Sequence, residues 1–133
     1  MDPNRLKQIP IFSHLSDEEA NRLAAFATET SVADGQILMK QGDYSTELIG
    51  IQEGTADVLR DGKKIASLKE GDLIGEMGLL RHEPRNADVI ATSPMRVMKL
   101  THWEIRRMSE ETLNRIKEIV AARREDGIAD PTY

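Results

Sequence analysis

The spacing of apolar residues changes twice along the chain and divides it into three regions. Four apolar residues come first: Leu6, Ile9, Phe12 and Leu15. Ser16 and Glu19 follow with the spacing of a capping box, which marks the start of a helix. Leu23 and Phe26 continue the pattern and are expected to face inward. This pattern predicts an N-terminal helical segment over residues 1–29.

Between residues 30 and 100, short apolar segments alternate with turn signals. Five pairs carry these signals: Asp34-Gly35, Gly42-Asp43, Glu53-Gly54, Asp61-Gly62 and Glu70-Gly71. Asp61-Gly62, between residues 55–60 and 63–68, predicts a tight hairpin because such a turn needs positive φ. Eight of the nine glycines lie between Gly35 and Gly78, as expected where a small barrel turns its corners. Short strands at this spacing predict a β-barrel or a β-sandwich.

After Leu100 the spacing is helical again. Thr101 and Glu104 form a second capping box, and Ser109, followed by two glutamates, begins a further helix. This last helix carries one apolar stripe: Leu113, Ile116, Ile119 and Val120. We therefore predict C-terminal helices over residues 101–126 and a short tail over residues 127–133.

Length and composition indicate one globular domain. The chain has 133 residues, 39% of them hydrophobic and 31% charged, and no apolar run is long enough to span a bilayer. Its first residues do not have the pattern of a secretory signal. The sequence contains no cysteine, which excludes disulfides and thiolate chemistry and favours a cytoplasmic location.

The charge of the chain disfavours a nucleic-acid surface. The formal net charge is −5, whereas nucleic-acid-binding surfaces are normally basic. In residues 101–126, six basic residues are balanced by six acidic ones, as in a solvated helix. We therefore expect no direct binding to nucleic acid or to a membrane.

One glycine-rich segment, residues 75–87, carries the candidate chemistry. Glu76 and Arg85 lie nine positions apart in it, and Gly75 and Gly78 permit close approach of the backbone. Arg85 offers a planar fork of donors that suits a phosphate, whereas ionised Glu76 can only accept and suits a ribose hydroxyl. A small molecule with both hydroxyls and a phosphate could bridge the two side chains.

This segment resembles the phosphate-binding cassette of the cyclic-nucleotide-binding domain family. Nine positions match the family pattern without a gap: Gly75, Glu76, Met77, Gly78, Leu79, Leu80, Pro84, Arg85 and Ala87. The resemblance implies a mainly β fold with flanking helices, namely an eight-stranded jelly-roll barrel between N-terminal and C-terminal helical segments. Residues 1–133 would then form a single cyclic-nucleotide-binding domain, with the barrel over residues 30–100 and the cassette over residues 75–87.

The resemblance also implies a role for each cassette residue. Glu76 would accept a hydrogen bond from the ribose 2′-hydroxyl, and Arg85 would pair with the cyclic phosphate. Backbone amides would complete the cradle, so the implied ligand-binding residues are Gly75, Glu76, Met77, Gly78, Arg85, Asn86 and Ala87. Many relatives carry Ser or Thr where this chain has Asn86, and the absence of Thr there favours cyclic AMP over cyclic GMP.

Three function classes follow from these residues. The favoured one is a non-catalytic sensor that binds a cyclic nucleotide and relays binding through its C-terminal helices to a homodimer partner or a separate effector protein. The second is a vestigial domain that serves in dimerisation or docking. The third is a catalytic domain acting on the nucleotide, but the nucleophile, Walker and zinc motifs of such enzymes are absent from the sequence.

Two further sets of residues favour structural roles. His14, His82 and His102 lie far apart and have no cysteine partners, so we predict neither a metal site nor a cofactor. Trp103 could stack on a nucleobase, but its position after the last strand favours packing in the core.

Overall fold

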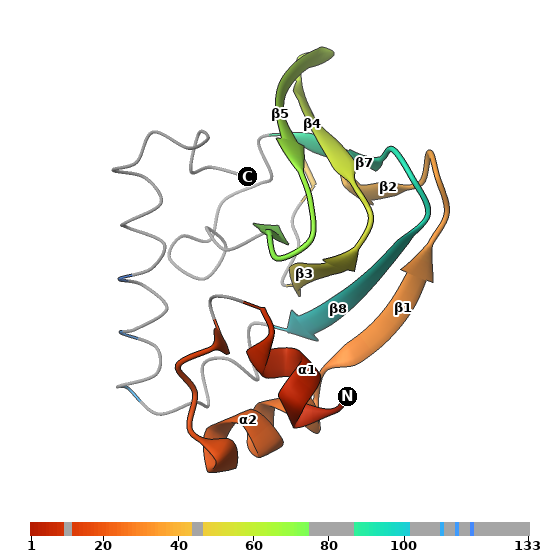
Figure 1. Cartoon of the computed structure of the whole chain (residues 1–133). Helices are drawn as coiled ribbons and strands as arrows, with labels where there is room; N and C mark the ends of the chain where they lie inside the picture. Colours follow the sequence, from red (N-terminus) through yellow and green to blue (C-terminus); the bar gives the residue numbers. More distant parts are fainter. Residues whose placement is uncertain are drawn as a thin grey trace.

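The computed structural model describes residues 1–9, 12–43, 47–74 and 87–101, together with Glu110, Asn114 and Glu118. The elements in this part of the chain are α1 (Pro3–Lys7), α2 (Asp17–Ala24), β1 (Thr28–Val32), β2 (Ile37–Met39), β3 (Glu47–Glu53), β4 (Ala56–Arg60), β5 (Lys63–Leu68), β6 (Leu73–Ile74), β7 (Asp88–Ala91) and β8 (Met95–Thr101). Two four-stranded sheets result, a first sheet in the order β1-β8-β3-β6 and a second in the order β2-β7-β4-β5 (Figure 1). Every strand pair is antiparallel, so the predicted jelly-roll fold is confirmed.

The strand β3 of the first sheet is buried on both faces. Along β3, every residue from Leu48 to Ile51 is buried. Leu48 belongs to an apolar cluster with α1 and α2, whereas Ile49 and Ile51 belong to the cluster inside the barrel. Successive side chains of a strand point to opposite faces, so β3 separates two cores. In Figure 1, α1 and α2 lie together beside β8 and β1 at one end of the barrel.

The N-terminal segment packs against a glycine of the first sheet. A Cβ atom added at Gly50 would lie 3.1 Å from Cδ1 of Ile9 and 3.1 Å from Cγ of Met98. Such contacts are tighter than most side chains accept, so glycine lets this part of β3 pack closely beneath the segment that follows α1.

Both helices begin at side-chain caps. The Oγ atom of Ser16 accepts a 3.1 Å hydrogen bond from the backbone N–H of Glu19, which confirms the capping box predicted for α2. The helix α1 lies within the predicted N-terminal helical segment, although the pattern did not mark it as a separate helix. Asp2 caps it and Pro3 occupies its first position.

The prediction for Phe26 is wrong. Leu23 is buried as expected, but Phe26 is 50% exposed. The helix α2 ends at Ala24, so Phe26 falls in the turn before β1, where helical spacing no longer determines which way a side chain points.

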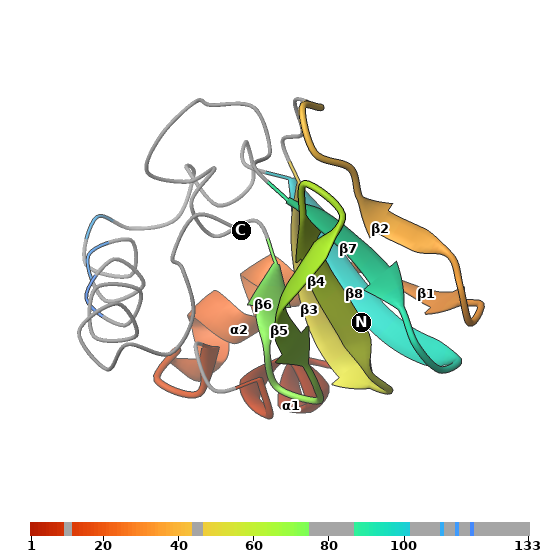
Figure 2. The same cartoon turned by 90° about the horizontal axis from the view of Figure 1, so that it is seen from above.

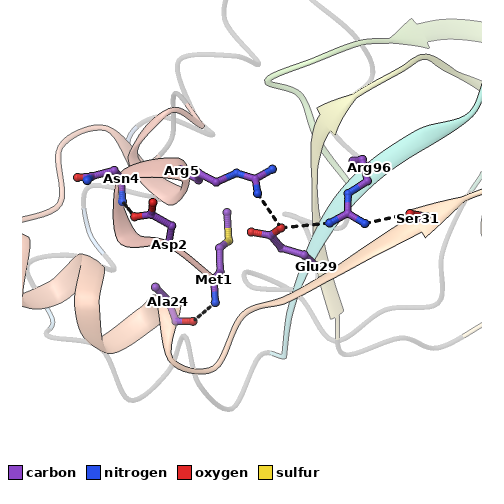
Figure 3. Close-up of polar contacts among 8 residues, drawn as sticks. All are labelled: Met1, Asp2, Asn4, Arg5, Ala24, Glu29, Ser31 and Arg96. Atoms are coloured by element: carbon purple, nitrogen blue, oxygen red, sulfur yellow. Dashed lines mark hydrogen bonds and ion pairs between the residues drawn. The ribbon is translucent and has the colours of Figure 1, made fainter.

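An ion-pair network joins α1 to the first sheet (Figure 3). The Oε2 atom of Glu29 on β1 lies 3.1 Å from Nη1 of Arg5 on α1 and 3.3 Å from Nη2 of Arg96 on β8. Nη1 of Arg96 also donates a 2.9 Å hydrogen bond to Oγ of Ser31. Figure 3 shows Glu29 between the two guanidinium groups.

The predicted hairpin connects β4 to β5. Its turn residues, Asp61 and Gly62, have φ values of 53° and 79°, as a tight hairpin of this kind requires. Arg60 pairs with Lys63 across the turn. The glycines of all five predicted turn pairs have positive φ: Gly35, Gly42, Gly54, Gly62 and Gly71.

The last described residues agree with the predicted C-terminal helix. Glu110, Asn114 and Glu118 are helical and exposed, and their spacing of four places them on one helix face. The residues of the predicted apolar stripe, Leu113, Ile116, Ile119 and Val120, all lie outside the described part of the chain. Among the described residues, we find no helix with the length and apolarity needed to cross a membrane.

Candidate functional site

The predicted cassette, residues 75–87, connects the two sheets. It begins after β6 in the first sheet and ends before β7 in the second. Six of the seven predicted ligand-binding residues lie outside the described residues: Gly75, Glu76, Met77, Gly78, Arg85 and Asn86. The seventh, Ala87, is described, and so are the two strands that flank the cassette.

The strand before the cassette is held by β3. Leu73 pairs with Gly50, and Ile74 pairs with Ile49. Just before β6, the carbonyl of Asp72 accepts a 2.9 Å hydrogen bond from the N–H of Ile51, and the carboxylate of Asp72 accepts one of 2.9 Å from the N–H of Lys69. These contacts fix the direction in which the chain enters the cassette.

The strand after the cassette is held on both sides. Asp88 pairs with Leu59 of β4, and Val89 pairs with Val58 of β4 and with Met39 of β2. Figure 2 shows β7 beside β2 and β4. The side chain of Ala87 is fully buried.

Both ends of the cassette are anchored in one core. Ile74 at one end and Ala87 at the other belong to the apolar cluster inside the barrel, although they extend from different sheets. A cavity is costly in such a close-packed interior, so the two ends are held in place by packing as well as by strand pairing. The barrel thus provides a rigid support for the segment that carries Glu76 and Arg85.

Sequence reasoning missed a polar contact next to the cassette. Oδ1 of Asp88, the first residue of β7, accepts a 2.7 Å hydrogen bond from the backbone N–H of Gln41. The side chain of Gln41 in turn contacts Asp61 in the β4–β5 turn. The residues Gln41 and Asp88 are 47 positions apart, so no local sequence signal indicates that they meet.

One carboxyl group with a shifted pKa, that of Asp17, lies far from the cassette in sequence. The hydrogen bond and the positive charge of Lys7 hold the pKa of Asp17 below its ordinary value. Asp17 is the first residue of α2, so this ion pair connects the two N-terminal helices.

Metal chemistry receives no support from the described residues. In that part of the chain, no three His, Cys, Asp or Glu side chains gather where they could hold a metal ion. His14 is exposed and lies just before α2. His82, His102 and Trp103 lie outside the described residues, so the roles predicted for them stay predictions.

The sequence matches the cyclic nucleotide-binding domain family over residues 29–112. This region includes the whole of the cassette and all eight strands except Thr28, the first residue of β1. The chain therefore belongs to the cyclic nucleotide-binding domain family, and the resemblance inferred from the cassette is confirmed.

Regulatory subunits of protein kinases are among the relatives. The chain is 33% identical to a cAMP-dependent protein kinase regulatory subunit of Yarrowia lipolytica over 115 residues, which are 85% of this chain and 31% of that protein. It therefore corresponds to about a third of the length of that relative.

Two solved structures have the same fold. The regulatory domain of Toxoplasma gondii PKA with cAMP superposes with a TM-score of 0.79 and 22% identity, over 90% of this chain and 48% of that one. The regulatory subunit of a cAMP-independent protein kinase A from Trypanosoma brucei gives a TM-score of 0.78 and 25% identity, over 90% and 43% of the two chains. Proteins with this fold thus include one bound to cAMP and one described as cAMP-independent.

Proposed function

We propose that this chain is a non-catalytic regulatory domain that binds a cyclic nucleotide and prefers cyclic AMP to cyclic GMP. The observation that carries the proposal is the complete cassette, with both Glu76 and Arg85, in a chain of this family. The similarity to a cAMP-dependent protein kinase regulatory subunit supports the choice of ligand. The strands that flank the cassette support it as well, because they are anchored in the barrel core.

Each residue has a chemical task in this proposal. Arg85 pairs its guanidinium fork with the cyclic phosphate, and Glu76 accepts a hydrogen bond from the ribose 2′-hydroxyl. The backbone N–H groups of Gly75, Met77, Asn86 and Ala87, with Gly78 in the same turn, surround the phosphate with donors. The side-chain amide of Asn86 can donate to the ligand where many relatives use a hydroxyl.

The proposal also covers organisation and output. Residues 1–133 form one domain, and the C-terminal helices relay nucleotide binding to a second copy or to a separate effector protein in the cytoplasm. A ligand shifts a conformational equilibrium only when it binds one state better than the other. The relay therefore requires these helices to differ between the free and the bound state.

A vestigial docking or dimerisation domain is the second candidate. The similar structure from Trypanosoma brucei supports this second candidate, because that protein is described as cAMP-independent. Domains of this fold that no longer bind the ligand usually lack the glutamate or the arginine of the cassette. This chain retains both, as Glu76 and Arg85. We therefore place the sensor first.

Titration with nucleotides tests the proposal. Cyclic AMP and, more weakly, cyclic GMP should raise the melting temperature of the chain, because a ligand that binds only the folded state stabilises it. Linear 5′-AMP is the control for nucleotide that lacks the cyclic phosphate. A melt that neither cyclic nucleotide shifts at millimolar concentration would leave the docking domain as the better account. Intact cyclic AMP after prolonged incubation would exclude turnover.

Hydrogen exchange tests the relay separately. Cyclic AMP should slow amide exchange from Trp103 to Arg124 and change the barrel strands less. Protection confined to Gly75–Ala87 would mean that the domain binds its ligand without transmitting the event.

A further inference from the structure

Gln41 joins three parts of the chain that are far apart in sequence. Its backbone N–H donates a 2.7 Å hydrogen bond to Oδ1 of Asp88 at the start of β7. Its side-chain Nε2 donates to Oδ1 of Asp61 at 2.9 Å, and its Oε1 accepts from the backbone N–H of Asp61 at 3.1 Å. One residue therefore connects the turn after β2, the turn between β4 and β5, and the strand that follows the cassette.

Both turns that Gln41 connects are well defined. Gln41 follows Lys40 in a turn that is closed by a 3.1 Å hydrogen bond from the N–H of Asp43 to the carbonyl of Lys40. Asp61 is the only non-glycine residue with positive φ in the described part of the chain. Its N–H and its carboxylate both bond to the Gln41 amide, which is a two-point contact with a fixed orientation.

The contact with Asp88 lies close to the cassette along the chain. Asp88 directly follows Ala87 and stands three residues after Arg85. The covalent chain allows at most about 11 Å between residues that are three positions apart. A displacement of Asp88 would therefore act on the chain only three residues after Arg85.

We propose that Gln41 is a positioning residue for the phosphate-binding arginine. It acts through Asp88, since the Gln41–Asp88 bond adds to the strand pairing that holds the start of β7. The Gln41–Asp61 contact in turn holds Gln41 in place. The inference rests on the proposed function, because it assigns Arg85 to the cyclic phosphate. A group held in the right geometry before the ligand arrives binds more tightly, because less freedom is lost on binding.

The chain offers a matched control for the side chain of Gln41. Gln36 also uses its Oε1 atom to accept a hydrogen bond from a backbone N–H in a turn, that of Ala33 at 3.2 Å. This turn lies between β1 and β2, and none of the contacts of Gln36 given above involves Asp88. Gln36→Ala therefore removes the same kind of bond from another turn of the barrel.

Four variants test the inference by calorimetric titration with cyclic AMP and by melting without nucleotide. Gln41→Ala should weaken binding about tenfold, or ~1.4 kcal/mol, and Gln36→Ala should leave affinity unchanged. The melting temperatures of these two variants should be alike. Asp88→Ala should weaken binding at least as much as Gln41→Ala, whereas Asp88→Asn keeps an Oδ1 acceptor and should restore affinity to near that of the unaltered chain.

The outcomes separate the two proposals. If the unaltered chain does not bind cyclic AMP, the proposed function fails. If it binds and Gln41→Ala binds equally well, or loses no more affinity than Gln36→Ala, the positioning role is overturned. If Gln41→Ala does not fold, the Asp88 pair decides, because equal loss in Asp88→Ala and Asp88→Asn would exclude a role for the bond to Gln41.

Discussion

The carboxylate of Glu29 on β1 lies 3.1 Å from Nη1 of Arg5 on α1. The same Oε2 atom lies 3.3 Å from Nη2 of Arg96 on β8 (Figure 3). The Glu29 side chain is only 16% exposed, whereas the Arg5 side chain is 43% exposed. Glu29 is therefore the least exposed member of this network, and its removal takes the shared carboxylate from both guanidinium groups.

We predict that Glu29→Ala lowers the free energy of unfolding by about 1–2 kcal/mol, because it removes two charge-assisted hydrogen bonds at a partly screened site. Urea denaturation measures this change. Glu18→Ala is the control, since Glu18 pairs with Arg22 at 3.2 Å on the exposed surface of α2. That variant should stay within about 0.5 kcal/mol of the unaltered chain. Equal losses in both variants would contradict the assigned role of Glu29.

Gly54 and Gly35 should respond differently to alanine. Both have positive φ, 96° and 85°, so each substitution carries a backbone cost of about 1–2 kcal/mol. A Cβ atom at Gly54 would also lie 2.5 Å from the carbonyl oxygen of Pro94, whereas one at Gly35 meets no atom within 4 Å. Gly54→Ala should therefore destabilise by about 1–3 kcal/mol more than Gly35→Ala in thermal unfolding. Equal melting temperatures would show that the Pro94 loop yields without cost.

The two phenylalanines of the chain provide a test of the N-terminal core. Phe12 is fully buried in the cluster between the helices and the first sheet, whereas Phe26 is 50% exposed. Phe12→Ala should cost about 3–5 kcal/mol in denaturant unfolding because it leaves a cavity. Phe26→Ala should cost less than about 1 kcal/mol. The reverse order would mean that Phe26 is covered in solution.

The Lys7–Asp17 pair predicts a dependence on pH. Lys7 holds the pKa of Asp17 below the ordinary value of 3.8, so ionised Asp17 favours the folded state. This contribution is fully present above the pKa of the unfolded chain and is lost as the pH falls through the lower pKa of the folded chain. A carboxylate titration followed by NMR should place the Asp17 midpoint below 3.8, and Lys7→Met should raise it toward that value. A midpoint that Lys7→Met does not move would exclude the pair.

Features set by neighbouring residues could be predicted from the sequence. The capping bond of Ser16 with Glu19 spans three residues, and the Asp61-Gly62 turn spans two, so propensity and φ requirements were sufficient. Phe26 was predicted wrongly because the pattern does not show that α2 ends at Ala24. The end of a helix depends on the packing of the chain that follows as well as on its own residues.

Contacts between distant segments could not be predicted. Glu29 and Arg96 are 67 positions apart, and Gln41 and Asp88 are 47 apart, so only the sheet topology brings them together. The cassette was recognised because its residues are contiguous and chemically specific. Its supporting contacts on β6 and β7 come from other strands and carry no such signal.

The pairing of Arg85 with the cyclic phosphate is the central claim, and calorimetric titration of Arg85→Ala with cyclic AMP tests it most directly. The substitution should cost about 2–5 kcal/mol of binding free energy, as for removal of one partner of a desolvated charge pair. Arg85→Lys should recover only part of the loss, because a point charge does not reproduce the planar fork. Arg22→Ala on the exposed surface of α2 should bind like the unaltered chain. Arg85→Ala that folds and binds cyclic AMP with unchanged affinity would contradict the claim and place the phosphate elsewhere.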